Sequence, residues 1–218
     1  MSLPNNTILL TELQLDRIAD GLTADGYVLF EDFLTPVLAQ ALLQEMQSFS
    51  ELAFKPAAIG RDNLQQLNET VRSNSLHWLD GNTFVQNAYL AIMEQLRIGI
   101  NRRLFMGLFD FECHYSHYRR GDFYKRHLDA FKGESNRVLS TVLYLNPDWC
   151  KKDEGELILY SDKQVSPLLM VEPKFNHCII FLSDVFPHEV LVTQSDRYSI
   201  AGWFRINGSH GIKVDPAA

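Results

Sequence analysis

Four residues in the second half of the chain have the types and order needed to hold a metal ion beside a small acid. His127 and Asp129 are two positions apart, His188 lies 61 positions after His127, and Arg197 follows nine positions later. Two imidazoles and one carboxylate on one face of a metal leave coordination positions open. This suits a non-haem Fe(II) ion that must also bind a co-substrate and O2. Zinc more commonly takes a tetrahedral site with a single open position.

The H-x-D pair is weak evidence when taken alone. With 7 histidines and 27 acidic residues in 218 positions, about one H-x-[DE] is expected by chance. The competing interpretation is that His127 and Asp129 form a surface polar pair and that His188 is a core histidine. The remaining histidines have no carboxylate two positions on, and we expect them to be structural: His77, His114, His117, His177 and His210.

Arg197 suggests the second half of a site. It follows a short polar turn after His188, so we expect it on the next antiparallel strand, facing the same cavity. A buried guanidinium needs an anionic partner, and its planar fork fits a carboxylate such as the distal one of a metal-chelating 2-oxo acid. The alternative is a surface arginine paired with Glu189 or Asp196. Tyr144 could donate its hydroxyl to the same carboxylate, although a tyrosine of this kind, taken alone, is more often an ordinary core residue.

The elements that must position these residues are short extended runs separated by turn residues. Eight such runs are expected: 111–118, 123–130, 137–146, 156–160, 168–172, 176–183, 188–193 and 197–206. Because side chains alternate along a strand, His127 and Asp129 would point to the same side. Strands of this number and spacing predict a two-sheet jelly roll, that is, a double-stranded β-helix.

The first half of the chain has mostly helical patterns. Thr11 and Gln14 have capping-box spacing, which predicts a helix over 12–20 that ends at Gly21. Further elements are expected as a strand over 27–33, a helix over 36–49, an extended segment over 76–79 and a helix from about 83 to 104. The fold class is therefore α+β, mainly β. A single domain would have N-terminal support over 1–110 and a catalytic core over 111–207.

The bulk composition narrows the functional classes. The chain has 46% apolar residues and a net charge of −7, with a pI near 5.5. This acidity argues against a general nucleic-acid binder, since such proteins rely on cations to contact phosphates. The three cysteines are far apart and form no C-x-x-C, as expected of reduced thiols. Without an apolar run of membrane-spanning length, a cytoplasmic protein is expected.

Several motifs along the chain occur together in one known family. In order they read V-R-S-N-S-L-H-W-L-D-G, Y-R-R-G-D-F-Y-K-R-H-L-D-A-F, L-Y-L-N-P-D-W, V-E-P-K-F, F-L-S-D, P-H-E-V and R-Y-S-I-A-G-W-F. From about Val71 to Phe204 the chain resembles the Fe(II)/2-oxoglutarate-dependent prolyl 4-hydroxylases. The resemblance is strongest to the animal oxygen-sensing enzymes of the EGL-nine type and their bacterial relatives.

The resemblance implies a role for each matching residue. The implied iron ligands are His127, Asp129 and His188. Arg197 would bind the distal carboxylate of 2-oxoglutarate with Tyr144 as its hydroxyl partner, and Tyr118 and Trp203 would line the pocket. The enzyme would consume O2 and 2-oxoglutarate, release succinate and CO2 and hydroxylate a prolyl residue, with ascorbate as a stimulant.

Contacts with a protein substrate are implied for Arg137, Arg72 and Tyr124. The aperiodic stretch 54–72 would be a loop at the mouth of the site. Two departures from the family pattern are visible. The segment between Asp129 and Arg137 is one residue longer than in the animal enzymes, and Gly155-Glu156 replaces a Gly-Gly step.

Other functions stay open at this stage. A nucleic-acid demethylase of the same superfamily usually has a second arginine six positions after the first, where this chain has Trp203. A small-molecule hydroxylase and a catalytically silent jelly-roll binding module are further alternatives. Prolyl targets in translation or regulatory proteins fit a compact cytoplasmic chain better than collagen-like targets. An oxygen-sensing role and constitutive modification are both compatible with this chemistry.

Overall fold

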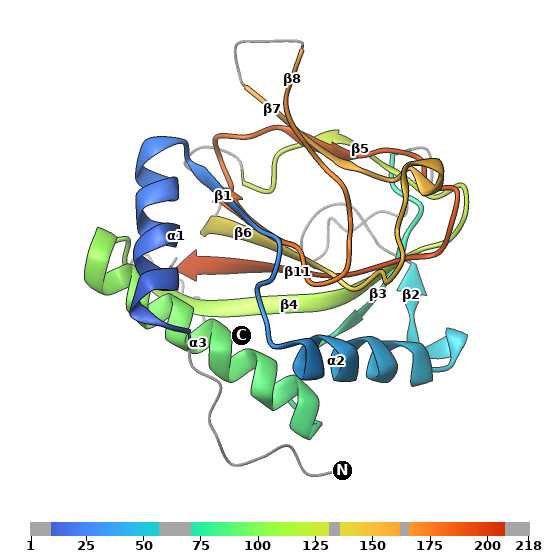
Figure 1. Cartoon of the computed structure of the whole chain (residues 1–218), viewed down its shortest axis with the longest axis horizontal. Helices are drawn as coiled ribbons and strands as arrows, with labels where there is room; N and C mark the ends of the chain where they lie inside the picture. Colours follow the sequence, from blue (N-terminus) through green and yellow to red (C-terminus); the bar gives the residue numbers. More distant parts are fainter. Residues whose placement is uncertain (1–9, 57–70, 131–135, 162–165, 208–218) are drawn as a thin grey trace, which may run out of the picture.

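The computed structural model describes residues 10–56, 71–130, 136–161 and 166–207. Two antiparallel sheets face each other, and three helices cover the outside of the larger sheet (Figure 1). The helices are α1 (Glu12–Ala24), α2 (Pro36–Ser48) and α3 (Phe84–Leu104). This arrangement confirms the predicted jelly roll with flanking N-terminal helices.

The large sheet has seven strands. In spatial order they are β1 (Tyr27–Phe30), β9 (Cys178–Leu182), β6 (Arg137–Tyr144), β11 (Arg197–Ile206), β4 (Leu108–Tyr118), β3 (Ser75–Trp78) and β2 (Lys55–Pro56). The small sheet consists of β5 (Tyr124–His127), β10 (His188–Val190), β7 (Leu157–Tyr160) and β8 (Pro167–Val171). All eight strands expected after residue 110 are present. Short 3-10 turns occur at η1 (Glu51–Ala53) and η3 (Lys151–Asp153).

The predicted end of the first helix is wrong. The capping box at Thr11 is present, but α1 continues through Gly21 to Ala24. Gly21 allows the helix to pack closely against Val28, and it does not end the helix. A Cβ at this position would lie 2.9 Å from the Cβ of Val28. The helix ends at the following turn, where Gly26 has φ +79°, a conformation that favours glycine.

One other boundary also differs from the sequence expectation. The first strand stops at Phe30 rather than at residue 33, because the next backbone N–H groups bond elsewhere. Those of Phe33 and Leu34 donate to Asn176 at 3.1 and 3.0 Å. The helix expected from about residue 83 does begin after Thr83, whose Oγ accepts a bond from the N–H of Gln86. Phe84, the first residue of this helix, is 67% exposed.

Alternation along the strands of the large sheet creates two separate cores. Residues such as Tyr115, Ile200 and Phe204 point outward and pack with the helices. Their neighbours point inward, where Tyr144 and Phe181 join residues of the small sheet in a second cluster. The outer core anchors the sheet, and the inner one lines the space between the two sheets.

The expectations about membrane-spanning segments and about the cysteines can be compared with the structure. In the part of the chain that is described, no helix has the length and apolar character to cross a membrane. Cys113, Cys150 and Cys178 are all free thiols. The expected loop over 54–72 falls mostly outside the described residues.

Candidate metal and co-substrate site

Two histidines face each other across neighbouring strands of the small sheet. His127 at the end of β5 is the direct register partner of His188 at the start of β10. Each ring is oriented by a backbone carbonyl, since Nδ1 lies 2.8 Å from the carbonyl oxygen of Lys125 in His127 and 3.0 Å from that of Phe186 in His188. A carbonyl can only accept, so Nδ1 carries the proton and Nε2 is left with a free lone pair.

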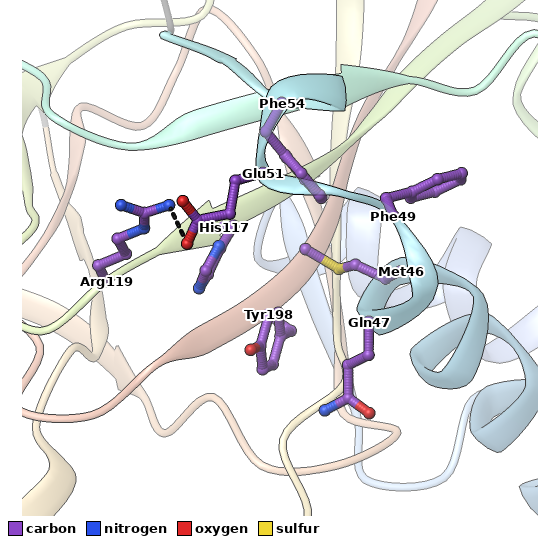
Figure 2. Close-up of a pocket in the computed structure, with 8 residues that line it drawn as sticks. All are labelled: Met46, Gln47, Phe49, Glu51, Phe54, His117, Arg119 and Tyr198. Carbon is purple, nitrogen blue, oxygen red and sulfur yellow. Dashed lines mark ion pairs between the residues drawn. The ribbon is translucent and has the colours of Figure 1, made fainter.

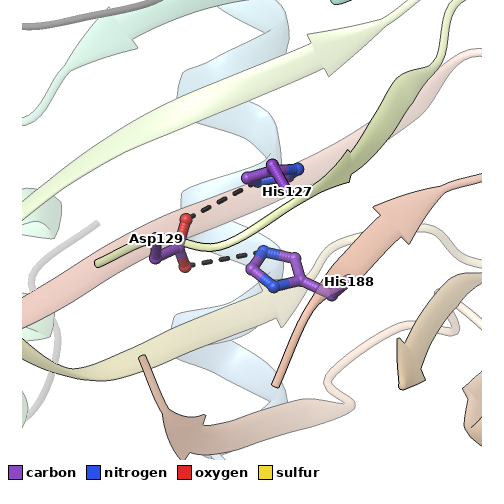
Figure 3. A group of neighbouring side chains, drawn as sticks. All are labelled: His127, Asp129 and His188. Atoms are coloured by element: carbon purple, nitrogen blue, oxygen red, sulfur yellow. Dashed lines mark ion pairs between the residues drawn. The ribbon is translucent and has the colours of Figure 1, made fainter. Parts of the chain in front are cut away.

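Asp129 completes the group (Figure 3). Its two carboxylate oxygens lie 3.6 Å from Nε2 of His127 and 3.5 Å from Nε2 of His188. One donor atom from each residue lies within 4.8 Å of the others. The interpretation of His127 and Asp129 as a surface pair is therefore wrong, because all three side chains converge at the interior edge of the small sheet.

The reasoning that put Asp129 in this place is only partly right. Strand β5 ends at His127, and Asp129 lies beyond it in a bend, so strand alternation does not set its direction. A hydrogen bond does this instead. The hydroxyl of Ser140 on β6 donates to Asp129 Oδ2 at 2.6 Å and lies 3.0 Å from the hydroxyl of Ser183. The large sheet thus holds the carboxylate, while the small sheet holds the imidazoles.

The charges of the group suit cation binding. Burial lowers the pKa of His188 to about 4, although the Asp129 carboxylate opposes this shift. At neutral pH the imidazole is therefore uncharged and can donate its lone pair. Burial alone would raise the pKa of Asp129, but its interactions with His188 and His127 outweigh burial and hold that pKa well below the usual range. A buried carboxylate that stays ionised beside the uncharged imidazole of His188 is a ready cation ligand.

Arg197 lies on the opposite sheet from His188. It lies on β11, the next strand along the chain as expected, but this strand does not pair with that of His188, because β10 pairs with β5 and β7 while β11 pairs with β4 and β6. It still faces the shared interior and is only 1% exposed. The alternative ion pairs do not form: Glu189 bonds to Tyr160, and Asp196 approaches His117.

The guanidinium of Arg197 is incompletely paired. Its Nε donates to the carbonyl of Gly155 at 2.9 Å and its Nη1 to the hydroxyl of Ser199 at 3.3 Å. Nη2 has no hydrogen-bond partner among the described residues, and neither has the buried hydroxyl of Tyr144. The guanidinium carbon lies 5.0 Å from the ring of Tyr144 and 4.9 Å from that of Tyr118. A buried cation and a buried hydroxyl, both short of a partner, form a receptor for an anion.

Comparisons with known proteins agree with this geometry. Residues 113–205 match the 2OG-Fe(II) oxygenase superfamily. A prolyl-4-hydroxylase from Pseudomonas putida is 39% identical, and its crystal structure superposes with a TM-score of 0.80 over 88% of this chain and 98% of that one. The chain belongs to the 2OG-Fe(II) oxygenase superfamily.

Two further relatives are animal proteins. Human prolyl hydroxylase EGLN3 is 24% identical over 215 aligned positions, which cover 89% of this chain and 84% of the relative. A Trichoplax adhaerens prolyl hydroxylase, solved in complex with a hypoxia-inducible-factor peptide fragment, has a TM-score of 0.78 at 24% identity, over 89% of this chain and 90% of that one. The second likeness shows the shared fold.

The residues of this oxygenase fit the two groups that its superfamily name implies. The His-Asp-His group offers two nitrogens and one carboxylate to an iron ion. The unpartnered atoms of Arg197 and Tyr144 suit the distal carboxylate of 2-oxoglutarate. Gly155 leaves room beside Arg197, since a Cβ at position 155 would lie 3.3 Å from the Arg197 side chain and 2.9 Å from Thr193.

The remaining expected site residues form two pairs of a guanidinium and an aromatic ring. Arg137 lies over Trp203, with Cζ 3.7 Å from the ring centroid. Arg72 lies over Tyr124 at 4.6 Å. Tyr124 in turn stacks on His127, with centroids 3.6 Å apart. Each of these residues therefore contacts another of the expected site residues.

Sequence reasoning missed the residues that hold these groups in place. Glu112 on β4 accepts from Nε of Arg137 at 2.8 Å, and Asn74 accepts from Nε of Arg72 at 2.6 Å. Ser140 lies on the same strand as Tyr144, four positions earlier, and its bond to Asp129 was not anticipated. Strand alternation could have suggested Ser140, whereas nothing local identifies Glu112 or Asn74.

The oxygenase has a hollow on the outer face of the large sheet (Figure 2). It is lined by Met46, Gln47, Phe49, Glu51, Phe54, His117, Arg119 and Tyr198. His117 and Tyr198 stack with centroids 4.8 Å apart, and Arg119 pairs with Glu51 at 3.1 Å. These strand residues alternate with the inward-facing Tyr118 and Arg197, so the hollow opens away from the His-Asp-His group.

Proposed function

We propose that this oxygenase hydroxylates a prolyl residue of a protein substrate, with release of succinate and CO2. The observation that carries the proposal is the pairing of a His-Asp-His group with a buried, incompletely paired Arg197 in one interior. The 39% identity to a bacterial prolyl-4-hydroxylase supports the choice of proline as the target.

Each residue then has a defined task. His127, Asp129 and His188 would hold Fe(II), with both imidazoles kept in the correct tautomer by backbone carbonyls. Arg197 would bind the distal carboxylate of 2-oxoglutarate through Nη2, and Tyr144 would donate its hydroxyl to the same group. When bound, iron and 2-oxoglutarate together supply the activation of O2 that oxidises a C–H bond. Tyr118 would close one side of the co-substrate pocket.

The protein residues around the co-substrate would position it and exclude water, and they would not transfer protons. Tyr144 is fully buried and its hydroxyl stays protonated, because burial raises its pKa. Burial likewise raises the pKa of Tyr118. Both phenols can therefore donate hydrogen bonds but are poor bases. Water would be excluded from the part of the interior around Arg197 and Tyr144. This strengthens the attraction between Arg197 and a bound carboxylate.

A polypeptide substrate is favoured by the rim of the site. Trp203 and Tyr124 each present a ring covered by a guanidinium, that of Arg137 or Arg72. Arginine donors and flat rings suit the carbonyl groups and the ring of a prolyl segment. We also propose that one domain spans residues 1–218, that the protein is cytoplasmic and that it acts without binding nucleic acid. Translation and regulatory proteins are the substrate classes to search.

The first test is turnover. Protein incubated with Fe(II), ascorbate and 2-oxoglutarate should release succinate, with ascorbate stimulating by keeping iron ferrous. His127→Ala and His188→Ala should abolish this release, whereas a silent binding module would release none even as wild type. Full activity in either variant would exclude these residues as iron ligands.

The second test addresses the target. Mass spectrometry of cellular proteins with and without the gene should reveal a proline that loses an oxygen-sized mass shift of about 16 Da when the gene is absent. A shift confined to other side chains, or to a small molecule, would replace proline as the target while leaving the oxygenase activity in place. Measuring the O2 concentration for half-maximal turnover would separate an oxygen-sensing role from constitutive modification.

A further inference from the structure

A stack of three planar groups runs from the rim of the site to His127. The imidazole of His127 lies 3.6 Å from the ring of Tyr124, with 18° between their planes. The guanidinium carbon of Arg72 lies 4.6 Å from the centroid of the same phenol ring. Tyr124 therefore contacts His127 and Arg72, and it is the link between them.

The stack supplies a constraint on His127 that hydrogen bonding does not. The carbonyl of Lys125 fixes Nδ1 at one edge of the ring, but a single hydrogen bond allows the ring to tilt about it. The face of Tyr124 blocks that tilt on one side. On another side lies His188, whose ring centroid is 4.3 Å away at 56°. The direction of Nε2, the atom that faces Asp129, therefore depends on Tyr124.

Arg72 is itself held by a short segment that crosses between the sheets. Its Nε donates to Asn74, which is 1% exposed. Residues 71–73 pair with β5 through bonds from Lys125 N–H to Val71 and from Ser73 N–H to Phe123. The chain then continues into β3 of the large sheet. Both sheets thus contribute to the position of this guanidinium.

We infer that Tyr124 and Arg72 are positioning residues for metal binding, through the orientation of His127, before any peptide is bound. This inference rests on the proposed role of His127 as an iron ligand. It adds a task for two residues at the rim whose expected role was substrate contact. Loss of groups that orient a metal-bound histidine typically weakens metal affinity by about 10- to 100-fold.

The experiment measures the dissociation constant for Mn(II) alone, by electron paramagnetic resonance of the free ion, with neither 2-oxoglutarate nor peptide present. Tyr124→Leu, which removes the flat ring, should weaken binding about tenfold. Tyr124→Phe keeps the ring and should bind within about twofold of wild type. Arg72→Gln should weaken binding about threefold, in the range of a half-exposed cation–π contact.

Two controls make the outcome specific. Arg126 on β5 stacks on Tyr160 at 3.9 Å and does not contact His127 through this stack, so Arg126→Gln should leave Mn(II) affinity unchanged. In the Tyr124→Leu background, Arg72→Gln should add nothing, because its effect passes through the missing ring. Circular dichroism of each metal-free variant verifies that it is folded.

The failures of the two proposals are distinguishable. His127→Ala with wild-type Mn(II) affinity would overturn the proposed metal site itself. Loss of binding in His127→Ala, together with unchanged affinity in Tyr124→Leu, would overturn only the positioning role. If Arg72→Gln weakens binding equally with and without Tyr124, Arg72 acts independently and the stack does not transmit its effect. Should Tyr124→Leu fail to fold, wild-type affinity in Arg72→Gln alone would still refute the role of Arg72.

Discussion

The outer and inner faces of the large sheet are made by the same strands, but the outer face forms an apolar core and the inner face carries buried polar residues. Outward-facing residues such as Ile200 and Phe204 are fully buried and apolar. Inward-facing neighbours on the same strand, Arg197 and Ser199, are equally buried but polar. Strand alternation allows this division, because successive side chains point to opposite faces.

The difference shows how stability and chemistry are separated. Arg197 Nη2, Tyr144 Oη and Trp203 Nε1 are buried on β6 or β11 and lack a hydrogen-bond partner among the described residues. The helical core holds such an atom too, the hydroxyl of Tyr89. Leaving such a buried atom without a hydrogen-bond partner costs on the order of 1–3 kcal/mol. The helices packed on the outer face offset this cost, so the inner face can stay prepared for ligands.

The largest effect should come from the inner face. Arg197→Ala should raise the KM for 2-oxoglutarate by about 100-fold, because truncating one partner of a buried charge pair costs about 2–5 kcal/mol. Arg197→Lys should recover only part of the loss, since an ammonium lacks the planar fork. Steady-state succinate release at varied 2-oxoglutarate concentration measures both. An unchanged KM in Arg197→Ala would show that the co-substrate carboxylate binds elsewhere.

The next effect belongs to the outer face. Ile200 is fully buried among residues of the helical core, so Ile200→Ala should lower the free energy of unfolding by about 2–5 kcal/mol. The folded protein should still bind 2-oxoglutarate within about threefold of wild type, because Ile200 points away from Arg197. Urea unfolding and isothermal titration measure the two quantities. A loss of affinity as large as that of Arg197→Ala would mean that the faces are not separable.

The strand pattern made much of this division predictable. Eight runs after residue 110 were expected and are present as strands, and His127, Asp129, His188 and Arg197 do share one interior. Periodicity was informative because each face of these strands is buried against a different layer. Local residue order therefore predicted the strands, although it did not set the direction of Asp129, which lies beyond β5.

What the sequence did not reveal depends on contacts between distant segments. Ser140 holds Asp129 from the opposite sheet. Glu112 pairs with Arg137, and each lies on a strand bordering β11. No periodic pattern encodes such pairs, because they depend on strand order. Similarly, the end of the first helix was misplaced because Gly21 serves close packing against Val28 rather than a turn.

A smaller effect should appear when the pH is lowered. His114 is buried on the inner face, and burial, with Arg72 and Arg137 nearby, lowers its pKa to about 3 from an ordinary value of 6.5. Below pH 6.5 the unfolded chain gains a proton at this residue that the folded chain does not accept until about pH 3. Stability should therefore be full above pH 6.5 and fall across this window by about 1.4 kcal/mol per pH unit from this residue.

Urea unfolding of the metal-free protein at about pH 7, 6 and 5 measures this dependence. His114→Asn should reduce the slope between pH 6 and 5 by about 1.4 kcal/mol per unit. His117 on the outer face is less buried, and although burial lowers its pKa, Asp196 opposes the shift. His117→Asn should therefore change the slope less. Equal changes in both variants would contradict the contrast between the faces.

The smallest effect is expected at the hydroxyl of Tyr144, where removal of one atom should change both stability and 2-oxoglutarate binding. Tyr144 is fully buried, and its hydroxyl has no partner among the described residues. Tyr144→Phe removes that oxygen and keeps the ring, so the protein without ligand should become more stable by about 1 kcal/mol. Affinity for 2-oxoglutarate should fall about tenfold, because a hydrogen bond to a charged group contributes about 1.5–3 kcal/mol. Thermal unfolding with and without 2-oxoglutarate measures both changes on one sample. A variant that is less stable without ligand would indicate that the hydroxyl already has a partner, and the inner face would then be less prepared for ligand than its unpartnered atoms suggest.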